Sequence, residues 1–194
     1  MDSIKNLTIF SGVNGAGKST LFYSENAGDL GIRLNSDEII RANGLDWKST
    51  SDQLYAGKVL LRLQADCFEK GISFNRETTL SSNEIFKTIQ QAKNLGYRIH
   101  LRYIGVNNPE IAKQRVAKRV SMGGHGVSPE TIDRRFQSSY DNFLRIFPLC
   151  DTINIYDNSG NSMVLVAYCK NGKITRNSIP CSWADSLLDK MKHQ

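Results

Sequence analysis

The sequence of 194 residues predicts an α/β domain in which helices cover both faces of a mainly parallel five-stranded sheet, followed by a C-terminal β-hairpin. Two observations carry this prediction. Runs of strand-forming residues alternate with segments of helical periodicity, which is typical of a parallel sheet joined by crossover helices. A glycine-rich stretch, Gly12 to Thr20, also follows the first strand-like run and precedes the first helical one. We therefore expect a three-layer α/β/α sandwich.

The first half of the chain contains three units of a strand followed by a helix. We expect strands at residues 6–11, 32–35 and 72–79 and helices at about 18–26, 52–70 and 81–96. The apolar positions at helical spacing are Leu54, Leu61, Ala65 and Phe68 in the second helix and Ile85, Ile89 and Ala92 in the third. The third helix begins with Ser81-Ser82-Asn83-Glu84, which has the Ser-x-x-Glu form of a capping box.

The second half of the chain adds two further helices, a strand, a hairpin and a last helix. We expect strands at 97–106 and 152–156, the hairpin within 162–178 and the last helix at about 182–192. The two helices begin at Pro109 and Pro129, since proline is well tolerated at the first helical position. The hairpin turns at Asn171-Gly172, a pair typical of two-residue turns. No linker interrupts the chain, so we expect one domain over residues 1–194, with a lid at about 109–136.

Composition is that of an ordinary globular protein, with 40% hydrophobic and 23% charged residues. No apolar run approaches the roughly 18 residues that a membrane span needs, and residues 1–5 lack the pattern of a signal peptide. The cysteines lie far apart, as expected of free thiols in a reducing compartment. They are Cys67, Cys150, Cys169 and Cys181. We therefore expect a cytoplasmic protein that binds no membrane, and the net charge of +6 favours anionic partners.

The stretch "GVNGAGKST" has the spacing of a P-loop. Glycines allow the tight turn that points successive N–H groups at an anion, and the helix that opens at Lys18 adds its positive end. Lys18 is placed to reach the β- and γ-phosphates, and Ser19 to ligate Mg²⁺. The expected nucleotide-binding residues are Gly12, Val13, Asn14, Gly15, Ala16, Gly17, Lys18, Ser19 and Thr20. The motif predicts ATP and Mg²⁺ as cofactors.

Asp37 follows the second strand, at the sheet edge where ligands bind in parallel α/β folds. The later strands do not have the apolar run ending in an acid that motor and transport ATPases use for Mg²⁺. A carboxylate near the γ-phosphate is suited to take a proton from an acceptor hydroxyl. Because Asn35-Ser36-Asp37 also resembles the start of a helix, the sequence leaves two interpretations open, a general base or a helix cap.

A second polar pair, Glu77 and Thr79, ends the third strand. Alternate residues of a strand point to the same side, so these two share a face with Asn75. A carboxylate beside a hydroxyl is suited to hold the hydroxyl groups of a sugar. The alternative is a strand end that passes into a helix cap, with Thr79 or Ser81 starting the helix.

Basic side chains mark the predicted lid. They are Arg115, Lys118 and Arg119 on one face of the first lid helix, and Arg134 and Arg135 on the second. A glycine-rich loop that contains His125 joins the two helices. This arrangement resembles the lid of a small-molecule kinase, in which guanidinium groups neutralise charge on the transferred phosphoryl group. A solvated basic face is the alternative.

In order and spacing, "GVNGAGKST", "NSDEIIR", "RETT" and "RVAKRVSMGGHGVSPETIDRRF" resemble the zeta toxin family, and more closely its small branch of kinase-like proteins. The resemblance covers about residues 5–147. It implies a P-loop kinase fold and transfer of the ATP γ-phosphate to a hydroxyl group of a UDP-activated sugar, such as UDP-N-acetylglucosamine. It also implies the toxin of a toxin–antitoxin pair, whose antitoxin partner blocks the ATP site.

The resemblance also implies roles for single residues. The catalytic residues would be Asp37, Lys18, Arg119 and Arg134, the metal ligand Ser19, and the substrate contacts Glu77, Thr79, Arg41 and His125. Asp37 would act as the base, and the two arginines would stabilise the transferred phosphate, with Arg135 as their neighbour.

The chain departs from the larger toxins because it lacks their substrate-side insertions and C-terminal extension. The mechanism therefore transfers more directly than the acceptor does. Two other functions stay open. A polynucleotide 5′-hydroxyl kinase also pairs a P-loop with an aspartate base, but its binding would weaken steeply with salt. A non-catalytic nucleotide-binding regulatory module would show no phosphate transfer that depends on Asp37.

Overall fold

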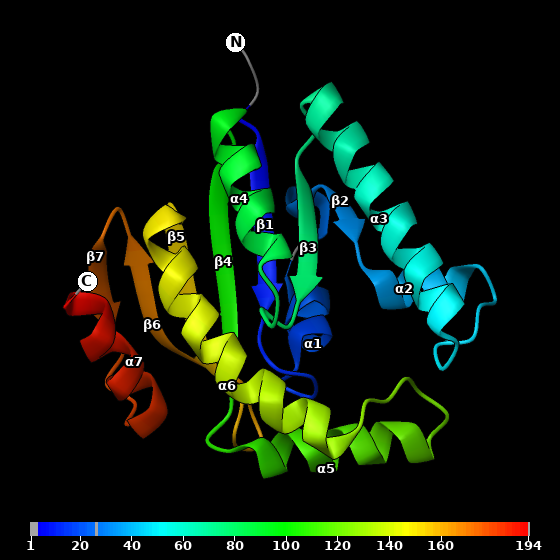
Figure 1. Ribbon diagram of the computed structural model, residues 1–194. Helices are drawn as coiled ribbons and strands as arrows, with labels where there is room; N and C mark the ends of the chain where they lie inside the picture. The colour runs from blue at the N-terminus through cyan, green and yellow to red at the C-terminus, as the bar shows by residue number, and fades with distance from the viewer. Residues whose placement is uncertain (1–3, 26, 194) are drawn as a thin grey trace.

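A seven-stranded sheet forms the centre of the molecule, in the order β2-β3-β1-β4-β5-β6-β7 (Figure 1). The computed structural model describes residues 4–25 and 27–193. The strands are β1 (Asn6–Ser11), β2 (Ile32–Leu34), β3 (Phe74–Thr78), β4 (Arg98–Gly105), β5 (Thr152–Asp157), β6 (Val164–Lys170) and β7 (Lys173–Arg176). β2, β3, β1, β4 and β5 pair in parallel, which confirms the predicted α/β class.

The C-terminal hairpin is part of this sheet, whereas the sequence predicted five strands with a hairpin beside them. β6 pairs antiparallel with β5 along its length, and β7 pairs with β6. The turn at Asn171-Gly172 is as predicted, with both residues at positive φ. Pairing with β6 satisfies the hydrogen-bonding groups of β5, which would otherwise form an exposed edge.

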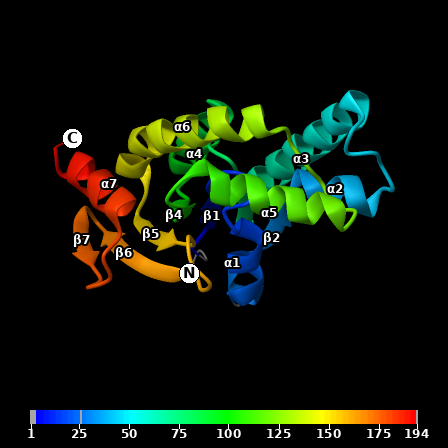
Figure 2. The ribbon, with the colours of Figure 1, turned by 90° about the horizontal axis from the view of Figure 1, so that it is seen from below.

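Helices cover both faces of the sheet. They are α1 (Lys18–Ser24), α2 (Ser36–Ala42), α3 (Thr50–Lys70), α4 (Glu84–Asn94), α5 (Pro109–Ser121), α6 (Pro129–Ile146) and α7 (Ser182–Lys192), with short 3₁₀ turns η1 (Ala27–Leu30) and η2 (Phe147–Leu149). Seen from below, α3, α4, α6 and α7 lie on one side of the sheet and α1 on the other (Figure 2). α5, which the sequence assigned to a lid, lies beneath the carboxyl end of β3 (Figure 1).

Two apolar clusters stabilise these layers. The larger joins the sheet to α3, α4, α6 and α7, and includes Phe74, Leu101 and Phe143, none of which is exposed to solvent. The smaller lies beneath the P-loop and joins β1 to α1 and α5 through residues such as Phe10 and Val116. The P-loop therefore rests on a packed support, which fixes the position of its backbone.

The predicted apolar face of α3 was right at Phe68, which is buried, and wrong at Leu54, Leu61 and Ala65, which are exposed. Leu60 and Gln64 are buried in their place. The reason is polar, because the Gln64 side chain accepts a hydrogen bond of 2.7 Å from Arg76 of β3, which is itself buried. A buried guanidinium needs such partners, so α3 turns Gln64 as well as Leu60 towards the sheet and leaves Leu61 exposed.

The predicted capping box at the start of α4 does not form. Asn83 stands at the N-cap position, and its side chain makes no capping hydrogen bond. Glu84 instead pairs with Arg76 at 2.7 Å, and the Ser81 hydroxyl lies 2.8 Å from that of Thr79. Arg76 therefore binds the Glu84 carboxylate that the capping box would have used.

The four cysteines are free thiols, as predicted. Among the described residues, no helix is both long and apolar enough to cross a membrane.

Candidate active site

The P-loop turns from β1 into α1 at the edge of the sheet where the parallel strands end. Gly12, Gly15 and Gly17 have φ angles of +139°, +83° and +105°, which residues with a side chain rarely adopt. Space is also limited, because a Cβ atom on Gly12 would overlap the carbonyl oxygen of Ile104. The backbone of the loop is therefore compatible only with glycine at these positions.

Lys18 is almost completely buried behind this loop, with 7% of its surface exposed. Its Nζ donates a hydrogen bond of 3.2 Å to the carbonyl oxygen of Val13 and lies 3.9 Å from Oε1 of Glu77. Burial lowers the pKa of Lys18, while the negative charges of Glu77 and Asp37 raise it. The ammonium group is thus held inside the protein by two carboxylates that face it.

A cleft of about 880 Å³ opens in front of Lys18, between the P-loop, α2, the end of β3, α5 and the loop that follows β5. Many of the predicted site residues line it together. They are Gly15, Gly17, Lys18, Ser19, Thr20, Asp37, Arg41, Glu77, Arg119 and His125. The structure therefore brings into one cleft residues that lie more than 100 positions apart in the sequence.

Asp37 is free to act in this cleft because it does not cap α2. The side chain of Asn35 is the cap, accepting a hydrogen bond of 2.9 Å from the backbone N–H of Asp37. The Asp37 carboxylate is 41% exposed, and its Oδ1 lies 3.6 Å from Nδ1 of His125. The sequence left two interpretations of Asp37 open, a general base or a helix cap. Because Asn35 is the cap of α2, the second interpretation is excluded.

Glu77 lies at the P-loop and not at the open end of the cleft. Its Oε2 accepts hydrogen bonds from the Ser19 hydroxyl at 2.9 Å, from Arg33 at 2.9 Å and from Asn35 at 3.1 Å. β3 is the direct neighbour of β1 in the sheet, so its last residues lie beside the phosphate loop. These contacts place the carboxylate next to the predicted Mg²⁺ ligand, Ser19.

Thr79, its predicted companion, does not share this environment. It follows the end of β3, its hydroxyl lies 2.8 Å from that of Ser81, and it is not among the residues that line the cleft. Asn75 is completely buried and donates to the carbonyl oxygen of Leu30 at 3.2 Å. The polar face of β3 therefore serves several separate contacts.

Two arginines of α5, in the predicted lid, line the cleft. Nε of Arg119 donates to the carbonyl oxygen of His125 at 2.6 Å, which fixes the lid loop. Among the described residues, Nη2 of Arg119 and Nη1 of Arg115 are buried without a hydrogen-bond partner. Buried guanidinium nitrogens without partners are costly, so both are suited to an anionic ligand. Lys118, between them in sequence, is exposed and does not line the cleft.

On α6 the structure distinguishes two adjacent arginines. Arg134 is exposed, whereas Arg135 is half-buried and its Nη1 donates a hydrogen bond of 2.8 Å to Asn14 in the P-loop. Burial lowers the pKa of Arg135, the charge of Arg134 lowers it further, and Asp37 raises it. Arg135 is thus the arginine of this pair that contacts the P-loop, although neither arginine lines the cleft itself.

The cleft also contains residues that the sequence did not identify as part of the site. Trp47 stacks on the ring of His125, with centroids 4.9 Å apart. Asn158 donates to the carbonyl oxygen of Ala16 at 2.8 Å, and Gly160 accepts from Arg115. No motif marks these positions, because they come from loops whose place in the sheet order is visible only in three dimensions.

Comparison with known proteins gives one family. The family model of zeta toxins matches residues 2–167. A similar curated protein is an uncharacterized protein of Haemophilus influenzae, which is 35% identical over 134 residues, covering 69% of this chain and 94% of that protein.

Solved structures of low sequence identity share the fold. The AvrRxo1-ORF1:-ORF2 complex with ATP contains a chain that is 18% identical, with a TM-score of 0.67 over 98% of this chain. This chain spans 64% of the length of that one. The PezAT toxin–antitoxin system of Streptococcus pneumoniae gives a TM-score of 0.65 at 18% identity, over 99% of this chain and 86% of its own.

Proposed function

Because this chain belongs to the zeta toxin family, we propose that it is an ATP-dependent kinase that transfers the γ-phosphate to a hydroxyl group of a small-molecule acceptor. One observation carries the proposal. A buried lysine, two guanidinium groups with unpartnered nitrogens and an accessible carboxylate that caps nothing converge on the same cleft. This combination is that of a phosphoryl-transfer site, where positioning and charge neutralisation provide most of the catalysis.

The triphosphate of ATP would occupy the space between the P-loop and α5. The backbone N–H groups of the loop and Lys18 would bind its β- and γ-phosphates. Arg119 and Arg115 already lie on the opposite wall, with nitrogens that lack partners in the described part of the chain. Each would gain charge-assisted hydrogen bonds on binding, which are about twice as strong as neutral ones.

Mg²⁺ fits the donor atoms at the P-loop. The Ser19 hydroxyl and the Glu77 carboxylate lie 2.9 Å apart, and both are oxygen donors. Within the described residues, no group of three or more His, Cys, Asp or Glu side chains is arranged to hold a metal. This suits Mg²⁺, which keeps several waters and is held by one or two protein groups and substrate phosphates. When bound, the ion would neutralise charge on the β- and γ-phosphate oxygens.

The acceptor would enter from the side of α2 and the lid loop. Asp37 would accept the proton of the attacking hydroxyl, and His125 lies near enough to orient that carboxylate. Trp47 and Arg41 line the same end of the cleft and offer an aromatic face and a cation. A UDP-activated sugar, with a base, a diphosphate and free hydroxyls, matches these features, and we propose this class of acceptor.

The decisive experiment incubates the protein with radiolabelled ATP, Mg²⁺ and separate panels of UDP-sugars and of oligonucleotides with 5′-hydroxyl ends. We expect labelled UDP-sugar, and activity that decreases only mildly as salt is raised. Labelling of oligonucleotides alone, with a steep salt dependence, would assign the chain to the polynucleotide kinases. Absence of transfer despite ATP binding would leave a regulatory nucleotide-binding module.

We also propose that this kinase is the toxin of a toxin–antitoxin pair, as in the PezAT system that shares its fold. An antitoxin would inhibit by covering the ATP cleft. Expression of the wild type should then arrest growth of the host, whereas Asp37→Asn should not. Equal arrest by both forms would separate toxicity from phosphate transfer and contradict the proposal.

A further inference from the structure

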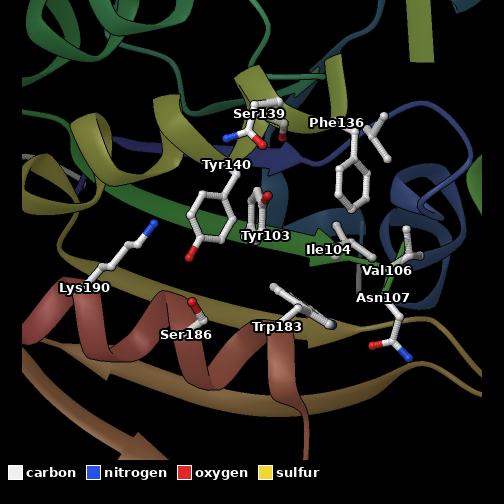
Figure 3. Close-up of a pocket in the computed structure, with 13 residues that line it drawn as sticks. Tyr103, Ile104, Val106, Asn107, Phe136, Ser139, Tyr140, Trp183, Ser186 and Lys190 are labelled. Atoms are coloured by element: carbon white, nitrogen blue, oxygen red, sulfur yellow. The ribbon is translucent and has the colours of Figure 1, made fainter. Parts of the chain in front are cut away.

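A second cavity, of about 300 Å³, lies between the end of β4 and helices α6 and α7 (Figure 3). In Figure 3, Tyr103 and Ile104 come from β4, Phe136 and Tyr140 from α6, and Trp183 from α7. None of the residues described as lining this cavity also lines the phosphate cleft. The cavity is therefore distinct from the phosphate cleft, although Val13 of the P-loop lines it, and it lies on the side of the sheet that α6 and α7 cover.

The aromatic wall of the cavity is fixed in place. Nε1 of Trp183 donates a hydrogen bond of 2.8 Å to Oδ1 of Asp157, at the end of β5. The indole ring packs directly on Gly105, where a Cβ atom would overlap it. A ring held at its nitrogen and against the backbone cannot easily fold into the cavity, so the space is pre-formed, as is usual for small-molecule sites.

One buried hydroxyl group, that of Ser139, lines this cavity beside the Tyr103 phenol. The Ser139 side chain is 1% exposed, and within the described chain its Oγ makes no hydrogen bond of good geometry. Burial raises the pKa of Tyr103 to about 12, while a weak hydrogen bond with the Ser139 hydroxyl lowers it. Because these two hydroxyls are only poorly paired, a ligand atom could offer Ser139 a better partner.

A cation stands at the other end of the cavity. Nζ of Lys190 lies 4.9 Å from the centre of the Tyr140 ring, and both residues line the cavity. Figure 3 shows Lys190 and Ser186 on α7, facing Tyr140 on α6. The cavity thus combines an aromatic body with a positive charge at its edge.

From these features we propose that the cavity binds a small aromatic carboxylate. The ring would lie among Tyr103, Phe136 and Trp183, and the carboxylate would pair with Lys190. A polar substituent on the ring would satisfy Ser139. A cavity of about 150 Å³ holds one benzene molecule, so this one has room for about two fused rings. The proposal does not depend on the kinase function.

Tryptophan fluorescence provides a specific test, because the chain contains only two tryptophans, Trp47 and Trp183. In the Trp47→Phe variant, Trp183 is the only reporter and it lies in the cavity wall. We expect 2-naphthoate to quench it saturably, and to bind more tightly than the neutral 2-naphthylmethanol of the same size. Absence of saturable quenching, or equal affinity for the two probes, would overturn the proposal.

Two variants, made in the same background, locate the binding. Lys190→Gln should weaken naphthoate binding about twofold to fivefold, as for a partly exposed ion pair. Lys192→Gln, on the same helix but paired with Asp189 at the surface, should leave it unchanged. Equal effects of the two changes would show a general response to surface charge and contradict a site at Lys190.

Ser139→Ala tests the poorly paired Ser139 hydroxyl, with 3-hydroxy-2-naphthoate as the probe. It should weaken binding of this probe about threefold to tenfold, as for one neutral hydrogen bond. The melting temperature should fall only slightly, because the hydrogen bond that Ser139 makes with Tyr103 is weak. A lower melting temperature with unchanged probe affinity would show that Ser139 serves the fold alone.

Discussion

At the scale of one residue, Lys18 shows how burial and neighbouring charges oppose each other in setting a pKa within the site. Its ammonium is enclosed by the P-loop and faces Glu77 and Asp37, while Arg119 and Arg135 oppose it. The lowered pKa means that burial outweighs the attraction of the two carboxylates in the protein without ligand. A triphosphate would reverse this balance, because it brings several negative charges to the same point.

The pKa of Lys18 gives a first prediction. Since this pKa is lowered on folding, the unfolded chain binds more protons between the lowered value and 10.5, and stability rises with pH in that window. Lys18→Met should therefore be at least as stable as the wild type near neutral pH. As the pH approaches 10, the free energy of unfolding of the wild type should increase relative to that of Lys18→Met. Urea unfolding of both proteins across this range measures the difference. A constant difference at every pH would contradict the assigned pKa direction.

Asp37 gives the second prediction. Asp37→Asn should lower phosphate transfer by about 10²–10⁴-fold, since the amide cannot accept a proton. ATP affinity and thermal stability should stay near those of the wild type, because Asn35 provides the helix cap. Asn35→Ala is the matched control and should cost about 1 kcal/mol of stability. Transfer by Asp37→Asn at the wild-type rate would end the general-base assignment.

Glu77 gives the third prediction, and it separates two roles. The resemblance implies a contact to the acceptor, but the carboxylate contacts Ser19, Arg33 and Asn35. Glu77→Gln should therefore raise the KM for Mg²⁺–ATP and the Mg²⁺ concentration required. Loss of a charged hydrogen-bond partner costs about 1.5–3 kcal/mol, or roughly tenfold to a hundredfold in affinity. Direct Mg²⁺–ATP binding by calorimetry provides a measurement that needs no acceptor. A raised KM for the acceptor alone would support the sugar contact.

At the scale of elements, the register of α6 decides which arginine reaches the P-loop. Pro129 starts the helix, and Ile132 and Phe143 turn its apolar side to the core. This register leaves Arg134 at the surface and directs Arg135 to Asn14. Helical spacing alone does not distinguish two adjacent positions near the edge of an apolar face, so the choice required the packed structure.

The fourth prediction compares these neighbours. Arg135→Ala should lower transfer at least tenfold, because it removes a cation beside the P-loop that stabilises charge on the phosphates. Arg134→Ala, its matched control, should change transfer less than about twofold, as for an exposed charge. Steady-state kinetics of both variants under identical conditions measures this. A larger loss of transfer in Arg134→Ala than in Arg135→Ala would favour Arg134, to which the resemblance assigns the catalytic role.

The predictions from sequence succeeded where one element determines the outcome and failed where two elements meet. Prolines and glycines marked most helix ends, and the P-loop spacing located Lys18. The buried face of α3 and the capping box of α4 were wrong for one reason, the burial of Arg76, which draws in Gln64 and Glu84. A strand arginine has no sequence signal that tells whether it will be buried.

At the scale of the whole molecule, the end of β5 and the loop that follows it contact α7, the P-loop and α5. Asp157 holds Trp183 of α7, Asn158 holds the P-loop, and Gly160 holds Arg115 of the lid. The position of this loop follows from the sheet order, in which β5 is followed by the hairpin. The sequence predicted the hairpin but not its pairing with β5, so the role of this loop in the site could not be predicted.

Asn158 makes this connection testable. Its side-chain amide donates to the carbonyl oxygen of Ala16, and it lies so close to Gly17 that a Cβ there would overlap it. Asn158→Ala should therefore loosen the P-loop and weaken ATP binding about threefold to tenfold, as for one lost hydrogen bond. Asn177→Ala is the control, because its exposed amide donates a hydrogen bond of 2.6 Å to the carbonyl oxygen of Leu165 in the distant hairpin. Calorimetry should show weaker ATP binding only in Asn158→Ala, and thermal unfolding should show the smaller loss of stability in Asn177→Ala, whose hydrogen bond is exposed to water. Equal ATP affinity in both would mean that the glycines and the packed support beneath the loop determine its shape without help from the β5–β6 loop.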